Sequence, residues 1–146
     1  DVFSSWRNLL RRLPDVAVAQ GAGVSAGRAV SDAGGPRALH ASAAGAGVDA
    51  ARQLWFTTPV PKPDHLPRMA ALCDVALDTL LYNSHTTGAD ALWTATPLVT
   101  IQGRAMASRV AHSLSRAAGL LEGTAHSHKE YEDLAVALLR QRPARD

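Results

Sequence analysis

Four short apolar segments, separated by stretches with helical spacing, constrain the fold of this chain more than any other feature. The pattern predicts strands at residues 16–19, 54–57, 75–77 and 98–101, with Trp55 and Phe56 of the second strand expected in the core. It predicts helices at about 3–13, 48–53, 64–72, 86–94, 105–118 and 130–140. Strands that alternate with helices are joined by right-handed crossovers. The order therefore predicts an α/β fold, with a parallel sheet covered by helices on both faces.

Residues 20–50 are the least informative part of the chain, because alanine and glycine dominate them. We expect a partly ordered loop there, followed by the short helix. Gly21-x-Gly23-x-x-Ala26 follows a predicted strand and imitates a dinucleotide fingerprint. That fingerprint needs an acidic residue at the end of a second strand, but Asp32 comes too early and Asp49 precedes the next strand. We therefore predict no dinucleotide cofactor.

Composition restricts the classes of function. The 146 residues suffice for one domain, and a net charge of +2 with scattered arginines gives no reason to expect nucleic-acid binding. The single cysteine, Cys73, excludes an internal disulfide, fits a reducing compartment and is predicted to be a buried thiol. No apolar run is long enough to span a membrane, and no signal-peptide pattern is present. Because the chain begins with Asp1, we expect a piece of a longer protein.

The turn between the strand at 75–77 and the next helix is the first candidate site. The helix is predicted to open at Thr86 and Thr87, where a threonine cap, free N–H groups and the helix dipole favour an anion. Gly88 would let a ligand approach the backbone. Asp90 lies one turn after Thr86 and suits the hydroxyls of a ribose or sugar. The alternative is an ordinary capped helix.

The second candidate site is the loop that follows the strand at 54–57. Lys62, His65 and Arg68 lie close together in it, and the backbone of Val60 could read the edge of a base. Composition alone predicts a solvated loop. However, this loop (58–68) and the turn at 80–90 both follow strands, and ligands bind at the carboxyl ends of such strands. The two segments are therefore expected to share one ligand.

Two other constellations are poor candidates. Ser108, His112 and Asp133 lack the sequence context of a nucleophilic serine, so we do not predict a catalytic triad. A second set of residues could form a metal site, but it lies in a polar stretch, so we expect a solvated surface and no metal there. That set comprises His126, His128, Glu130 and Glu132.

The segment His85-Thr86-Thr87-Gly88-x-Asp90-x-Leu92-Trp93 closely resembles the O-GlcNAc transferase family. The resemblance includes Leu77-Asp78-Thr79, Thr96-Pro97-Leu98-Val99-Thr100, Ala107-Ser108-Arg109-Val110 and Glu130-Tyr131-Glu132. It extends from Phe56 to about Leu139, which matches the last part of the family's catalytic region. Phe3-x-x-Trp6 through Pro14 also resembles the helix that opens the family's second catalytic lobe. Residues 20–50 depart from the family.

The resemblance implies a Rossmann-like sheet, the second lobe of a GT-B glycosyltransferase, with residues 1–140 as this lobe and 141–146 as a tail. It implies that UDP-GlcNAc is the donor and that no metal or other cofactor is needed. Val60, Lys62, His65 and Arg68 would contact the uridine. His85, Thr86 and Thr87 would surround the pyrophosphate and sugar, and Asp90 the ribose.

The resemblance also implies a function: transfer of N-acetylglucosamine to Ser or Thr hydroxyls of cytoplasmic and nuclear proteins. The first lobe, a Gln-x-x-Lys segment and tetratricopeptide repeats would precede Asp1 in the intact enzyme. No catalytic residue is therefore expected in this piece, which alone should not catalyse. The alternatives are an O-fucosyltransferase of the related branch, which uses GDP-fucose, and a non-catalytic module that binds a nucleotide sugar.

Overall fold

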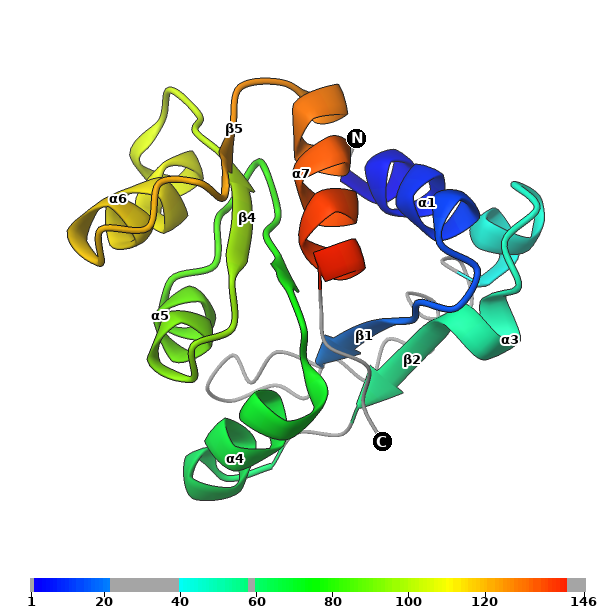
Figure 1. Cartoon of the computed structure of the whole chain (residues 1–146), viewed down its shortest axis with the longest axis horizontal. Coiled ribbons are helices and arrows are strands. Elements are labelled where there is room, and N and C mark those ends of the chain that lie inside the picture. Colours follow the sequence, from blue (N-terminus) through cyan, green and yellow to red (C-terminus); the bar gives the residue numbers. More distant parts are fainter. Residues whose placement is uncertain (1, 22–39, 58–59, 142–146) are drawn as a thin grey trace. The chain divides into compact units, whose positions relative to one another are not determined.

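The computed structural model describes residues 2–21, 40–57 and 60–141. They belong to two compact units, one of residues 1–5 and 62–146 and the other of residues 6–61. Figure 1 shows the elements of both units, most of them labelled. Each unit is described by itself.

The unit of residues 6–61 is built on a pair of parallel strands. Its elements are most of α1 (Val2–Arg12), β1 (Val18–Gly21), α3 (Ala50–Gln53) and β2 (Leu54–Thr57). Val18 lies opposite Leu54 in the register of β1 and β2. The buried Gln53 donates hydrogen bonds from Nε2 to the carbonyls of Leu10, Leu13 and Val16. The Gln53 amide therefore satisfies the Leu10 carbonyl in the last turn of α1 and ties the segment that follows α1 to the end of α3.

The other unit contains a three-stranded parallel sheet flanked by helices. In chain order it comprises α4 (Lys62–Leu72), β3 (Ala76–Leu77), α5 (Thr86–Trp93), β4 (Leu98–Ile101), the 3₁₀ helix η1 (Met106–Ser108), α6 (Val110–Ala117), β5 (Thr124–Ala125) and α7 (His128–Gln141). The strand order is β3-β4-β5. Figure 1 shows α7 on one side of β4 and both α5 and α6 on the other. The core includes Val99, Ala111, Tyr131 and Ala135, which are buried.

The predicted α/β class and the parallel pairing are confirmed. The strands at 54–57 and 98–101 lie at their predicted residues, and the helix predicted at 105–118 is divided into η1 and α6. The prediction missed β5 because it has only two residues and no apolar run. Gly23 and Ala26 of the imitated fingerprint lie outside the described residues.

Three predictions about side chains or loops are wrong. Trp55 and Phe56 were expected in the core, but their exposed fractions are 60% and 37%, and only Leu54 of β2 is buried. Cys73 is half-buried rather than buried. The helix predicted from residue 64 begins two residues earlier, at Lys62, so Pro67 lies inside α4 rather than in its first turn, and its ring removes one backbone hydrogen bond. As a consequence, the candidate side chains of this segment lie on a helix.

Among the described residues, no helix has both the length and the apolar character that a membrane crossing requires.

Candidate functional site

Asp78, which follows β3, is the most buried carboxylate of the candidate site. Its Oδ1 accepts a hydrogen bond from the Ser84 backbone N–H (2.6 Å), and its Oδ2 accepts one from the Thr100 hydroxyl (2.6 Å). The Tyr131 hydroxyl donates to the Asp78 carbonyl (3.0 Å). Burial raises the pKa of the Asp78 carboxyl, while the bonds from Thr100 and Ser84 oppose that rise. This residue therefore joins β3, β4, α7 and the turn before α5.

Asn83 fixes the same turn from its other side. Its side-chain amide donates to the Thr79 carbonyl (2.8 Å), and its backbone N–H donates to the Ala107 carbonyl (2.7 Å). Its Oδ1 accepts from the backbone N–H of Ala111 in α6 (3.4 Å). Asn83 is fully buried, so these bonds replace its contacts with water. Asn83 was not among the predicted site residues, although Asn inside a polar turn often forms hydrogen bonds between its side chain and the backbone.

Helix α5 opens at Thr86, as predicted, but not with a threonine cap. The N-cap residue is His85, whose side chain makes no capping bond, and both threonines lie in the first helical turn with exposed side chains. Their positions inside the helix prevent either hydroxyl from acting as the N-cap group. Gly88 is needed for packing, because a Cβ there would lie 2.8 Å from the Ser84 Oγ. The first N–H groups of α5 thus depend on other partners.

His85 is the N-cap residue of α5, so its side chain lies next to the position of a ligand bound at the N-terminus of that helix. Its ring stacks on Tyr82, with ring centroids 4.7 Å apart and planes inclined by 8°. Its Nε2 is buried and has no hydrogen-bond partner in the part of the chain that the structure describes. A buried ring nitrogen without a partner carries a desolvation cost, which a bound ligand can remove.

Residues from both candidate segments meet in this unit. The Lys62 Nζ, in the first turn of α4, lies 2.8 Å from the Asp90 Oδ1 of α5. His65 is half-buried and Arg68 exposed on the same α4 helix. Val60 belongs to the other unit, so its predicted contact with a base edge stays a prediction. The pairing of Lys62 with Asp90 shows that the start of α4 and the first turns of α5 are neighbours.

In the two weaker constellations, the side chains form hydrogen bonds that belong neither to a catalytic triad nor to a metal site. The Ser108 hydroxyl donates to the Ala105 carbonyl, and His112 Nδ1 lies 3.2 Å from the Thr124 hydroxyl. His128 Nδ1 lies 3.1 Å from the Ser5 hydroxyl. Within residues 2–21, 40–57 and 60–141, no cluster of three or more His, Cys, Asp or Glu side chains is arranged to hold a metal.

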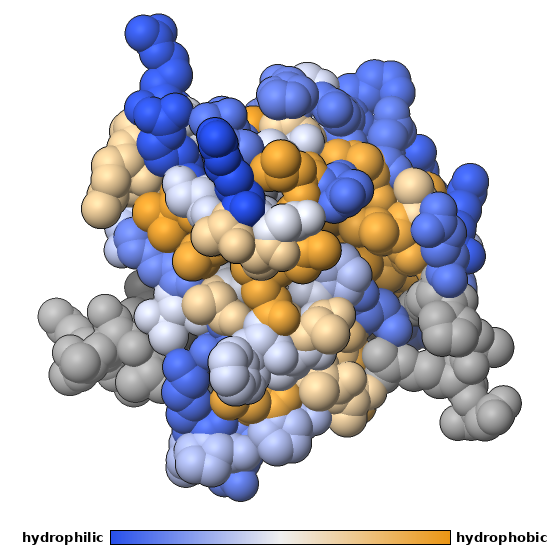
Figure 2. Space-filling model, turned by 60° about the vertical axis from the view of Figure 1, so that its left-hand side comes forward, coloured by the Kyte–Doolittle hydropathy of each residue, from blue (hydrophilic) through white to orange (hydrophobic). Residues whose placement is uncertain are grey.

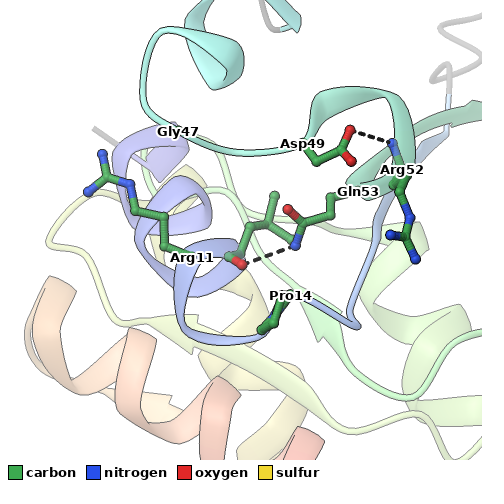
Figure 3. Close-up of a pocket in the computed structure, with 7 residues that line it drawn as sticks. Arg11, Pro14, Gly47, Asp49, Arg52 and Gln53 are labelled. Atoms are coloured by element: carbon green, nitrogen blue, oxygen red, sulfur yellow. Dashed lines mark hydrogen bonds between the residues drawn. The ribbon is translucent and has the colours of Figure 1, made fainter.

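A pocket of about 250 Å³ lies in the unit of residues 6–61 (Figure 3). Arg11 and Arg52 line it, but the Arg11 Nε donates to the Ala46 carbonyl. The Asp49 carboxylate accepts from the Arg52 backbone N–H, as the dashed line in Figure 3 shows. None of the predicted site residues lines this pocket.

A second pocket, of about 410 Å³, lies at the amino ends of β4 and β5 and is called the amino-edge pocket. Apolar side chains dominate its lining, including Leu92, Leu98 and Leu138, and the buried Ser115 hydroxyl there has no hydrogen-bond partner among the described residues. Figure 2, which brings the side of α5 and α6 forward, shows apolar side chains in orange gathered among polar ones in blue. This pocket lies at the opposite end of β4 from Thr100 and the residues bonded to Asp78.

Comparison with known proteins places the chain among glycosyltransferases. A probable UDP-N-acetylglucosamine–peptide N-acetylglucosaminyltransferase (SEC) of Arabidopsis thaliana is 38% identical over 144 residues, which are 98% of this chain and 14% of that protein. The UDP-N-acetylglucosamine–peptide N-acetylglucosaminyltransferase of Caenorhabditis elegans is 46% identical over 92 residues, which are 63% of this chain and 8% of that protein.

A solved structure and a family model agree with these relatives. A mutant O-GlcNAc transferase of Thermobaculum terrenum matches with a TM-score of 0.84 and 36% identity, covering 96% of this chain and 26% of that one. The chain therefore spans a small fraction of the length of each of these proteins. The model of glycosyl transferase family 41 matches residues 1–144. This chain belongs to glycosyl transferase family 41 and corresponds to part of the catalytic region of its O-GlcNAc transferases.

Proposed function

We propose that this chain binds UDP-GlcNAc for a protein O-GlcNAc transferase, as the second lobe of its catalytic region. The whole enzyme would transfer N-acetylglucosamine to Ser or Thr hydroxyls of cytoplasmic and nuclear proteins. The first lobe and tetratricopeptide repeats would be its partners in that enzyme. The chain covers 14% of the Arabidopsis relative, so the residues that bind the acceptor and the catalytic residues would come from the rest of the protein.

The observation that carries the proposal is the 2.8 Å ion pair between Lys62 and Asp90. Residues of the segments 58–68 and 80–90, which were expected to share one ligand, are thus neighbours in the fold. Lys62 supplies a positive charge, and the free N–H groups at the start of α5 supply further donors. Asp90 supplies acceptors for ribose hydroxyls. A nucleoside diphosphate sugar combines the negative charge and the hydroxyl groups that this set of residues suits.

The remaining predicted residues have roles in the same proposal. His85, with its buried Nε2 lacking a partner, and the exposed Thr86 and Thr87 would contact the pyrophosphate and sugar. On α4, His65 would stack on the uracil, and Arg68 would contact the nucleotide. Val60 would bind the base through its backbone. As the family resemblance implies, we expect this site to need no metal.

The fucosyl alternative predicts a different nucleotide. An O-fucosyltransferase would bind GDP in preference to UDP, and a fold relative that has lost its donor site would bind neither. The curated relatives named above are described as N-acetylglucosaminyltransferases, which favours UDP-GlcNAc.

Calorimetric titration of the 146-residue chain with UDP and, separately, with GDP tests the proposal. We expect UDP to bind at least tenfold more tightly, a difference of about 1.4 kcal/mol. Tighter binding of GDP would support the fucosyl alternative. Absence of binding to either nucleotide by the folded chain would contradict donor binding by this part of the enzyme.

A further inference from the structure

Asp78 combines deep burial with a set of neutral partners. Its exposed fraction is 1%, and its carboxylate accepts from the Thr100 hydroxyl and the Ser84 N–H. No Lys or Arg of the described residues forms an ion pair with it. A buried carboxylate without a cationic partner is costly for folding. This cost points to a role of the Asp78 carboxylate other than stabilising the fold.

The bonds of Asp78 reach the start of α5 through one residue. Ser84, whose N–H is held by the Asp78 Oδ1, immediately precedes His85, and α5 begins at the next residue. The Asp78 carbonyl is itself held by the Tyr131 hydroxyl of α7, and Oδ2 is held by Thr100 of β4. Asp78 is thus anchored to α7 through its backbone carbonyl and to β4 through its Oδ2, while its Oδ1 holds the turn. Movement of Ser84 would move His85 and the first turn of α5 with it.

We propose that Asp78 is a positioning residue for the diphosphate end of the donor site. Its carboxylate holds Ser84 so that the His85 ring and the first N–H groups of α5 point toward the ligand. This inference rests on the proposed function, since the ligand is the donor nucleotide. Asp78 itself touches no ligand.

Asp78→Ala and Asp78→Asn separate this role from a contribution of charge. Alanine removes both accepting oxygens, so the Ser84 N–H loses its partner. Asparagine keeps an oxygen that can accept from Ser84, and its amide can donate to the Thr100 hydroxyl, which accepts as well as donates. Asp133→Ala is the matched control, because it removes a carboxylate that forms an exposed ion pair with Lys129 on α7.

Two measurements on the 146-residue chain test the proposal: UDP affinity by calorimetry, and amide hydrogen exchange of Ser84 by NMR. We expect Asp78→Ala to weaken UDP binding roughly tenfold and to accelerate exchange at Ser84. Exchange at Ala135, in the middle of α7, should change much less. Asp78→Asn should restore most of both properties, and Asp133→Ala should change neither.

A folded Asp78→Ala chain with unchanged UDP affinity would overturn the proposal, as would an Asn variant as weak as the Ala variant. If Asp78→Ala does not fold, Thr100→Val replaces it, because this variant removes one anchor of the carboxylate. Unchanged UDP affinity and unchanged Ser84 exchange in Thr100→Val would then count against positioning.

Failure of the proposed function gives a different result. If the wild-type chain does not bind UDP, the donor-site assignment is wrong. Exchange at Ser84 still reports whether Asp78 holds the turn. Faster exchange in Asp78→Ala would then support the local role while overturning its link to UDP.

Discussion

The two ends of the three-stranded sheet are built by different kinds of interaction. At the carboxyl edge, which we define as residues 78–90 with Thr100, the fully buried side chains are the polar ones of Asp78, Asn83 and Thr100. Asp78 and Asn83 bond to backbone groups of the turn, of the segment before α6 and of α6 itself. Each bond has a direction and a narrow distance range. This edge therefore has a defined backbone geometry.

At the amino edge, leucine side chains from α5, β4 and α7 line the amino-edge pocket. Apolar contacts depend on area and packing rather than on direction. Changes there should alter stability without altering geometry at the other edge. Affinity for a ligand and stability of the fold should therefore be separable by mutation in this unit.

The largest expected effect is at the carboxyl edge. Asp90→Ala should weaken UDP binding tenfold or more, because loss of a hydrogen bond involving a charged group costs about 1.5–3 kcal/mol. His65→Ala should also weaken UDP binding, because it removes the ring proposed to stack on the uracil. Calorimetric titration measures the change, with thermal unfolding to show that the variants are folded. Unchanged affinity in both folded variants would show that the site residues are wrongly assigned.

At the amino edge, Leu138→Ala should lower the free energy of unfolding by about 2 kcal/mol, since a half-buried leucine lies at the low end of the range for such truncations. UDP affinity of the folded variant should stay within about twofold of wild type, since additivity holds for sites without shared partners. Urea unfolding and calorimetry measure the two quantities. A tenfold loss of affinity would show that the two edges are coupled.

The pH dependence of stability should distinguish the buried carboxylate from other groups. The pKa of Asp78 is raised above its ordinary value of 3.8, so the folded state holds this proton more tightly than the unfolded state. Its contribution to stability is therefore fully present below pH 3.8 and is lost as pH rises through the folded pKa. Asp78→Asn should gain stability relative to wild type over that rise. Parallel stability curves for the two proteins, from urea unfolding between pH 3.5 and 8 (about the range that spans these states), would contradict the raised pKa.

The smallest expected effect compares two helix ends. α5 and α6 end with the same pattern of backbone bonds, Thr96 N–H to Ala91 and Leu120 N–H to Ser115. The residue with positive φ is Ala95 (57°) in α5 and Gly119 (74°) in α6. Alanine is strained in this conformation, so Ala95→Gly should stabilise the unit by about 1 kcal/mol and Gly119→Ala should destabilise it by about as much. Thermal unfolding of both variants measures this, and a shift of the same sign in both would contradict it.

The sequence predicted the order of elements well because hydrophobic spacing is a local property. The strands at 54–57 and 98–101 and the opening of α5 at Thr86 follow from residues that are adjacent in the chain. Trp55 and Phe56 were placed wrongly, because a run of apolar residues does not show which side of a strand is covered. The start of α4 was predicted two residues late because several prolines in 59–67 indicate a loop, although proline is acceptable in a first turn.

The members of the candidate site stay predictions, and its internal contacts were not predicted at all. The residue types at 62, 65, 85 and 90 suggested a nucleotide, and this interpretation came mainly from resemblance to a family. The bonds of Asp78 with Thr100 and Tyr131 join residues far apart in the chain, which no local pattern indicates. Asn83 was overlooked for the same reason, since its partner Ala111 lies on a later helix.

The hydrogen bond from the Tyr131 hydroxyl to the Asp78 carbonyl has a consequence for the order of folding. The two residues are 53 positions apart, so the bond closes a long loop and forms only after α7 reaches the sheet. During synthesis, β3 and the turn at 79–85 leave the ribosome well before Tyr131 does. The geometry of this edge should therefore be among the last features that a newly made chain acquires. Refolding experiments in which hydrogen exchange is pulsed should find the Ser84 amide protected no earlier than the amides of α7.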